Sequence, residues 1–203
     1  MWKVMERYWG EKKVKPIRKT AGEAVEKHIS VQDNKIYFYS SVNRNACSEL
    51  NKKVSELETK SITLYNTLDI EKPPIILLIN SGGGTIVSGI ASMDTIIRCK
   101  VPVWTYVDGF SASAATFMTV VGTKRFMSRN SYMLIHQLST QFWGKYSEFE
   151  DEKKNLDLMM NTIKNVYKEH TKLPMKKLDE ILKHDLMWDA KTCLKYGLID
   201  EII

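Results

Sequence analysis

The feature that most constrains the fold is an uninterrupted run of five aliphatic residues at 75–79. Such a run is apolar on both faces, which is typical of a strand inside a parallel sheet. Apolar residues at helical spacing follow at Ile86, Ile90, Met93, Ile96 and Ile97. A second apolar run, 101–107, then predicts another strand. Strand, helix and strand in this order predict a right-handed crossover and a parallel α/β sheet.

The remaining elements follow from apolar spacing and capping signals. We expect strands at 35–39, 125–127, 132–135 and 198–203. Helices are expected at 43–60, 116–121, 174–183 and 189–197. Ser147 and Glu150 form a capping-box pattern at the start of a further, long helix, and residues 61–74 are expected to be a connection.

Length and charge favour one domain with a basic tail. A chain of 203 residues is long enough for a single core. Residues 1–20 hold seven Lys and Arg against two Glu, whereas the remainder is nearly neutral. We therefore divide the chain into a basic tail, 1–30, and one folded domain, 31–203. Because the domain lacks a basic excess, we expect no nucleic-acid partner.

The other compositional signals favour a cytoplasmic protein. No apolar run approaches the roughly 20 residues of a membrane span, and the charged N-terminus does not resemble a signal peptide. Cys47, Cys99 and Cys193 lie far apart, without the spacing of metal ligands. We expect these thiols to be reduced, which suits the cytoplasm.

Two glycine-rich junctions, 82–84 and 109–115, follow the two predicted strands. They therefore fall at the carboxyl edge of the sheet, where α/β proteins place their ligands. Residues 82–84 lack the Lys and Ser/Thr of a phosphate loop, so a backbone N–H cradle for an oxyanion fits equally well. The second junction holds serines where a strand turns into a helix, which suits an acyl-transfer nucleophile. Its alternative interpretation is a helix start that merely packs closely.

A histidine and a carboxylate could complete such a site. His136 ends a predicted buried strand, whereas His28, His170 and His184 are expected to be solvated. Asp185, Asp189 and Asp200 are candidates for the acid that orients the imidazole. Asp189 has a structural explanation as a helix cap, and Asp185 has none, so we favour Asp185.

Four motifs in order resemble the proteolytic subunit of the Clp protease. They are the glycine-rich loop at 79–84 (Ile-Asn-Ser-Gly-Gly-Gly), the nucleophile motif at 109–114 (Gly-Phe-Ser-Ala-Ser-Ala), the histidine motif at 133–137 (Met-Leu-Ile-His-Gln) and the C-terminal segment from His170 to Asp200. The similarity runs from about Ile36 to Asp200 and leaves a viral or phage member of the family open.

The resemblance implies a site, a fold and an assembly. Ser113 would be the nucleophile, His136 the general base and Asp185 the orienting acid, with the N–H groups of Gly83 and Ala114 as oxyanion donors. The fold would be the α/β spiral shared with crotonases, with a long protruding helix. Two stacked seven-membered rings would enclose the sites and receive unfolded polypeptides from an ATP-dependent AAA+ unfoldase. The resemblance implies no cofactor and no metal.

The sequence also departs from the family. Gly82 stands where proline is usual, and Lys183–His184 replaces an acidic–basic pair that helps to couple the rings. Ala114–Ala115 resembles stand-alone phage head-maturation proteases and signal-peptide peptidases, which we keep as an alternative. A crotonase-like acyl-CoA enzyme and a non-catalytic ring subunit are further alternatives.

Overall fold

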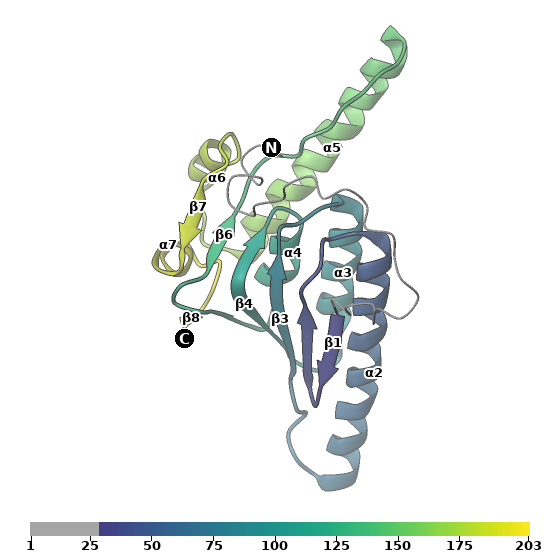
Figure 1. Ribbon diagram of the computed structural model, residues 1–203, viewed down its shortest axis with the longest axis vertical. Coiled ribbons are helices and arrows are strands. Elements are labelled where there is room, and N and C mark those ends of the chain that lie inside the picture. The colour runs from purple at the N-terminus through teal and green to yellow at the C-terminus, as the bar shows by residue number, and fades with distance from the viewer. Residues whose placement is uncertain (1–28) are drawn as a thin grey trace, which may run out of the picture.

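The computed structural model describes residues 29–203 (Figure 1). Its strands are β1 (Ile29–Gln32), β2 (Lys35–Phe38), β3 (Ile75–Ser81), β4 (Val103–Ala112), β5 (Lys124–Met127), β6 (Tyr132–Leu134), β7 (Met187–Asp189) and β8 (Glu201–Ile202). Its helices are α2 (Arg44–Leu68), α3 (Ile86–Arg98), α4 (Ala115–Val120), α5 (Tyr146–His170), α6 (Met175–Ile181) and α7 (Ala190–Lys195). The predicted tail, 1–30, lies outside the described residues except for Ile29 and Ser30, which begin β1.

One mixed sheet organises the fold in the order β1-β2-β3-β4-β5-β8, and β6 and β7 branch from β4. Strands β2, β3, β4, β5 and β8 run parallel, which confirms the predicted crossover topology. Helices α2, α3 and α4 lie on one face of the sheet (Figure 1). β3 alternates between buried and half-buried residues, so its second face is less covered than its composition suggests.

The branch point of the sheet is Gly109, inside β4. Residues 104–107 of β4 pair with β5, and residues 110–112 pair with β6. Gly109 has φ +93°, a conformation that glycine adopts readily, and it lies where β4 changes partner. The sequence predicted that the strand would end at Val107, and this is wrong: β4 continues to Ala112, and the turn falls at Ser113.

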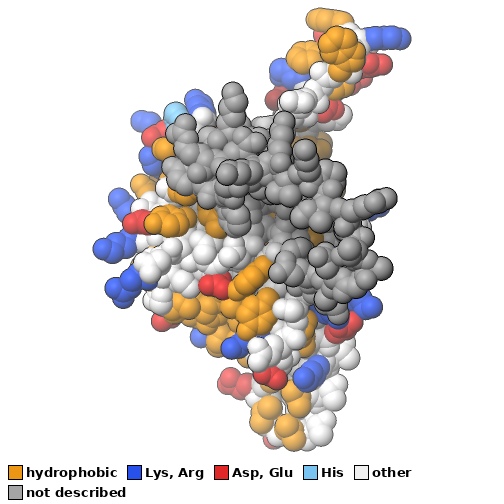
Figure 2. Space-filling view, viewed as in Figure 1, with side chains coloured by type: hydrophobic (Ala, Val, Ile, Leu, Met, Phe, Trp, Pro, Cys, Tyr) orange, Lys and Arg blue, Asp and Glu red, His pale blue; other side chains and the backbone are white. Residues whose placement is uncertain are grey.

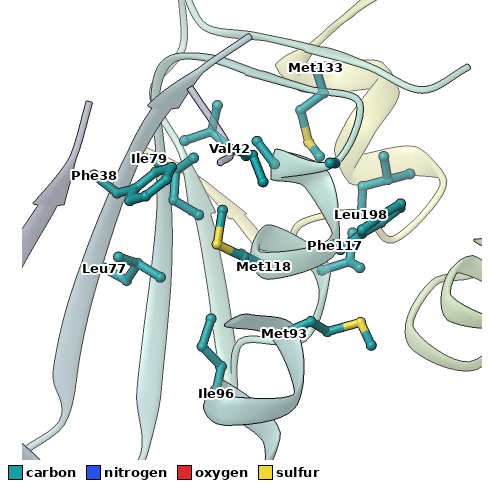
Figure 3. Close-up of a cluster of buried hydrophobic side chains, with 14 of the residues drawn as sticks. Phe38, Val42, Leu77, Ile79, Met93, Ile96, Phe117, Met118, Met133 and Leu198 are labelled. Carbon is teal, nitrogen blue, oxygen red and sulfur yellow. The ribbon is translucent and has the colours of Figure 1, made fainter. Parts of the chain in front are cut away.

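The core lies between the sheet and its helices (Figure 3). Leu77 and Ile79 from β3 face Met118 from α4, and the loop residue Val42 packs into the same cluster. Each of these four side chains is at most 1% exposed. This packing holds the carboxyl end of β3 in a fixed position relative to α4.

The predicted end of the first helix at Lys60 is wrong, because α2 continues to Leu68. Residues 61–68 are rich in Ser, Thr and other weak helix formers, so propensity alone favoured a connection. Tertiary contacts extend the helix: Ile62 packs against the core, and Ser61 Oγ donates to Pro73 O at 2.7 Å. Asp69, in the left-handed region, ends α2.

Helix α5 begins at Tyr146, two residues before the predicted start. Glu148 Oε2 accepts a hydrogen bond from the Lys145 N–H at 2.8 Å, so Ser147 is not the N-cap. The helix has three buried residues, Ile163, Val166 and Tyr167, all near its C-terminal end. Its other end projects away from the sheet (Figure 1). Across residues 29–203, no helix has the length and apolar character needed to cross a membrane.

Candidate active site

Ser113 occupies the turn between β4 and α4 with φ +54°. Two other non-glycine residues in the described part of the chain have positive φ, Asp33 in the β1–β2 turn and Asp69 at the end of α2. Aspartate tolerates this region because its side chain can hydrogen-bond locally. Serine gains little such help, and backbone strain of this kind clusters at functional sites. The Ser113 turn thus has the strained strand-to-helix geometry of a nucleophile turn.

Parallel pairing brings His136 to the same edge of the sheet as Ser113. Ala112 of β4 is opposite Leu134 of β6, and the Ser113 N–H donates to Leu134 O at 2.9 Å. His136 follows Leu134 by two residues. Within residues 29–203, no hydrogen bond joins the Ser113 hydroxyl to His136. In unliganded enzymes such contacts are often long, and they tighten when substrate binds.

Antiparallel pairing brings Asp185 to His136 from the other side. Tyr132 is opposite Asp189, and Leu134 is opposite Met187, in the β6–β7 pair. Continuing this register by two residues places His136 opposite Asp185. Their side chains meet there, with His136 Nδ1 2.9 Å from Asp185 Oδ1. This contact leaves His136 Nε2 free to accept a proton from another group.

The surroundings of His136 favour a neutral imidazole. Its side chain is 7% exposed, and burial lowers the pKa of His136 below its ordinary value, because the charged form loses hydration. The charge of Asp185 and its hydrogen bond oppose this effect. His136 is therefore unprotonated near neutral pH, as a general base must be.

Gly83 lies directly against the Ser113 turn. A Cβ at this position would lie 2.5 Å from Ala112 O and 2.6 Å from Ser113 Cβ, so glycine alone fits. Val42 fixes the loop from outside: its N–H donates to Gly83 O, and its carbonyl accepts from the Thr85 N–H, both at 2.8 Å.

The Gly83 N–H is not free in this structure. It donates to Ser81 Oγ over a long distance, 3.2 Å. An oxyanion is a stronger acceptor than a hydroxyl, since hydrogen bonds to a charged partner are about twice as strong. The Gly83 N–H could therefore change partner, provided that the Ser81 hydroxyl releases it.

The other two candidate acids have different contacts. Asp189 caps α7, with its Oδ1 accepting from the Thr192 N–H at 2.8 Å. Asp200 pairs with Arg125 at 2.5 Å, and this hydrogen bond is the main reason that its pKa is lowered. The structure therefore brings Asp185 to the histidine and places the other two in structural contacts.

A buried hydroxyl pair beneath Ser113 was not apparent from the sequence. Thr116 Oγ1 donates to Ser113 O, and it lies 2.6 Å from the Tyr167 hydroxyl. A threonine three residues after the serine, at a helix start, signals the hydrogen bond to Ser113 O, but nothing local signals the contact with Tyr167.

No cluster of three His, Cys, Asp or Glu residues in the described part of the chain could hold a metal ion. The groups at this edge of the sheet are instead a serine, an imidazole with a carboxylate partner, and backbone N–H groups. This set can carry out nucleophilic acyl transfer without a metal.

Comparison with known proteins gives a consistent result. The family model described as Clp protease matches residues 28–203. An ATP-dependent Clp protease proteolytic subunit from Deinococcus radiodurans is 32% identical over 153 residues, 73% of this chain and 75% of that protein. The ATP-dependent Clp protease proteolytic subunit 2 from Treponema denticola is 35% identical over 156 residues, 76% of this chain and 78% of that protein.

A solved structure has the same fold. A mutant ClpP1 from Listeria monocytogenes superposes with a TM-score of 0.69 at 25% identity, covering 80% of this chain and 86% of its own. This likeness confirms the predicted α/β spiral with its protruding helix. On the family match and the two relatives, the chain belongs to the Clp protease family, whose members are peptide hydrolases.

Proposed function

We propose that this Clp-family peptidase is a serine endopeptidase that hydrolyses unfolded polypeptides with Ser113, His136 and Asp185. The observation that carries the proposal is the 2.9 Å contact between His136 Nδ1 and Asp185 Oδ1, at the sheet edge where Ser113 turns into α4. A nucleophile, a base and a group that orients the base are the three parts that this chemistry requires.

In the first half of the reaction, Ser113 Oγ attacks the substrate carbonyl carbon as its proton passes to His136 Nε2. Asp185 holds the imidazole through Nδ1 and stabilises the imidazolium that forms. The carbonyl oxygen becomes an oxyanion and accepts hydrogen bonds from the Gly83 and Ala114 N–H groups. His136 then gives its proton to the leaving amine, the C–N bond breaks, and an acyl ester remains on Ser113.

In the second half, a water molecule gives a proton to His136 Nε2 and attacks the ester carbon. The new tetrahedral oxyanion uses the same two N–H donors. His136 returns the proton to Ser113 Oγ, the ester bond breaks, and the carboxylic acid product leaves. The cycle consumes one water and restores every group.

The His136–Asp185 contact also discriminates between the alternatives. A crotonase-like acyl-CoA enzyme needs the oxyanion N–H groups but has no use for a paired histidine and aspartate. A non-catalytic ring subunit needs neither the oxyanion N–H groups nor a paired histidine and aspartate. The contact therefore favours a peptidase, whether it works in rings or as a stand-alone phage or signal-peptide-peptidase type.

The free half of α5 favours assembly into homo-oligomeric rings. Several large apolar residues on it or just before it are exposed: Trp143 100%, Tyr146 78%, Leu158 67% and Phe149 55%. Hydrophobic side chains gather at its free end (Figure 2). Burial against another copy would remove this surface from water. Rings of seven, stacked in pairs around a chamber, are what the family resemblance implies; a native mass of a single chain would contradict them.

An enclosed chamber would make the peptidase dependent on a partner. The two relatives are named as ATP-dependent subunits, and we extend this to the present chain. A cytoplasmic AAA+ unfoldase would feed it unfolded chains. The purified protein should then cleave short peptides but leave a folded protein intact. Degradation of the folded protein without ATP would contradict this part of the proposal.

The test of the proposal is peptide hydrolysis by the wild type and by Ser113→Ala at matched oligomeric state. The variant should lose about 10⁶-fold in kcat, because nucleophile and base act as a unit. Thr119→Val, which alters a buried hydroxyl on the same helix, serves as the control and should retain activity. Equal activity of Ser113→Ala and wild type would refute the proposal.

A further inference from the structure

The carbonyl of Ser113 is held by two hydrogen bonds from one residue. Thr116 donates to it through its backbone N–H at 3.0 Å and through its hydroxyl at 2.6 Å. Thr116 lies in the first turn of α4 and is fully buried. The carbonyl of the strained residue in this turn is therefore fixed in direction by groups that solvent cannot replace.

A tyrosine from a distant helix completes the arrangement. The Tyr167 hydroxyl lies 2.6 Å from Thr116 Oγ1, although the two residues are 51 positions apart. A threonine hydroxyl carries one proton, and here that proton goes to Ser113 O. Tyr167 must therefore be the donor to Thr116. Burial raises the pKa of Tyr167, so its hydroxyl keeps this proton.

The hydrogen bonds from Tyr167 through Thr116 end on the peptide group between Ser113 and Ala114, whose N–H is an oxyanion donor in the proposed reaction. Ser113 C=O and Ala114 N–H belong to one planar peptide unit and point in opposite directions. Fixing the carbonyl therefore fixes the aim of the N–H. Donors in series also polarise one another, so the Ala114 N–H becomes a stronger donor than an isolated amide.

We propose that Thr116 and Tyr167 are positioning residues that aim and polarise the Ala114 N–H for the oxyanion; the inference rests on the proposed function. Neither side chain touches substrate. These hydrogen bonds also link the Ser113 turn to α5, in which Tyr167 is one of the three buried residues. Loss of these hydrogen bonds should reduce the stabilisation of the transition state and leave substrate binding unchanged.

The chain offers a matched control one turn further along α4. Thr119 is also fully buried, and its hydroxyl bonds Ser111 Oγ at 2.9 Å and Ala115 O at 3.3 Å. Thr119→Val and Thr116→Val therefore remove the same group from the same helix. Of the two, only Thr116 hydrogen-bonds Ser113.

The experiment measures kcat and KM for peptide hydrolysis, and the rate at which a fluorophosphonate labels Ser113. Thr116→Val should lower kcat and the labelling rate by about tenfold at unchanged KM, less than the loss of a whole oxyanion donor, because the backbone bond to Ser113 remains. Tyr167→Phe should lower both by about threefold. Thr116→Ser should restore them, and Thr119→Val should leave them unchanged.

The pH profile separates positioning of the oxyanion donor from damage to the base. The acid limb of kcat/KM should keep its midpoint in Thr116→Val, since His136 and Asp185 are untouched. Wild-type kcat in Thr116→Val, or an equal loss in Thr119→Val, would overturn the inference and leave the proposed function standing. If Thr116→Val does not fold, an unchanged kcat in Tyr167→Phe overturns it. A wild type that neither hydrolyses peptide nor labels at Ser113 overturns the proposed function, and the inference with it.

Discussion

The two sides of His136 are built by different means. On one side, the turn that carries Ser113 follows β4, which runs parallel to β6 in the sheet. On the other side, Asp185 precedes the three-residue strand β7, which runs antiparallel to β6. The His136 side chain is 7% exposed, whereas that of Asp185 is 42% exposed. Ser113 follows a central strand of the sheet. Asp185 reaches His136 from the C-terminal segment, through the pairing of β7 with β6.

The site can therefore be disturbed selectively from the aspartate side. Changes at Asp185, or in the C-terminal elements that carry it, can act on the histidine without deforming the Ser113 turn. The segment that carries Asp185 is joined to β6 by the β6–β7 pairing and to Gln137 by the hydrogen bond from the Gln137 N–H to Leu182 O at 2.8 Å, whereas the Asp185 side chain itself is 42% exposed. We therefore expect effects on turnover and effects on folding to separate on the aspartate side.

The largest effect on the aspartate side should come from Asp185→Asn. An amide in this position presents a donor to the imidazole and favours the wrong tautomer, so kcat should fall about 10⁴-fold. The melting temperature should barely change, because Asp185 is half-exposed. Peptide hydrolysis and thermal unfolding measured on the same preparation check both. Near-wild-type turnover would show that the two sides of His136 are not parts of one site.

The pH dependence of kcat/KM tests the contact between His136 and Asp185. Burial lowers the pKa of His136, so wild-type kcat/KM should fall as pH drops through a midpoint below about 6.5. Asp185 raises this pKa, and the Asp185→Asn midpoint should therefore move to still lower pH. A midpoint that moves to higher pH would contradict the assigned contact.

A smaller effect, on stability, is expected from Arg125→Met. Arg125 Nη1 donates to His170 O at 2.5 Å and to Gly197 O at 2.9 Å, and the guanidinium also pairs with Asp200. The variant leaves these acceptors without their donor and should lower the free energy of unfolding by about 3 kcal/mol. Chemical denaturation measures this. Unchanged stability would mean that contacts other than those of Arg125 hold the C-terminal segment on the sheet.

The smallest effect should come from Asp189→Ala. Asp189 stands at the far end of β7 from Asp185 and caps α7 through the Thr192 N–H. Loss of the cap should lower the melting temperature slightly and leave most of the activity. Thermal unfolding and hydrolysis, measured beside Asp185→Asn, test the contrast. An inactive Asp189→Ala with an active Asp185→Asn would reverse the assignment of the two acids.

The serine side of His136 could be predicted from the sequence, and most of the aspartate side could not. The Ser113 side follows from local signals: an apolar run, a glycine and small residues at the sheet edge. Strand β7 was not predicted, because three residues carry no usable periodicity and this strand exists only through its pairing with β6. Asp185 was favoured by resemblance and by elimination, and the register that sets it opposite His136 is a property of the folded chain.

Other misses have a similar origin. Weak helix formers in the second part of α2 concealed a helix that Ile62 and Ser61 anchor to the body. The Tyr167–Thr116 pair joins residues 51 positions apart, and no local pattern signals such a contact. Periodicity reports which face of an element is apolar, but it does not report which buried hydroxyls will meet.

Covalent labelling tests directly whether Ser113 is the nucleophile. The native protein is treated with a fluorophosphonate, digested, and the modified peptide is sequenced by mass spectrometry. We expect a single adduct on Ser113, absent after denaturation and much slower to form in Asp185→Asn. An adduct on Ser81 or Ser111 instead, or an unmodified native protein, would contradict it.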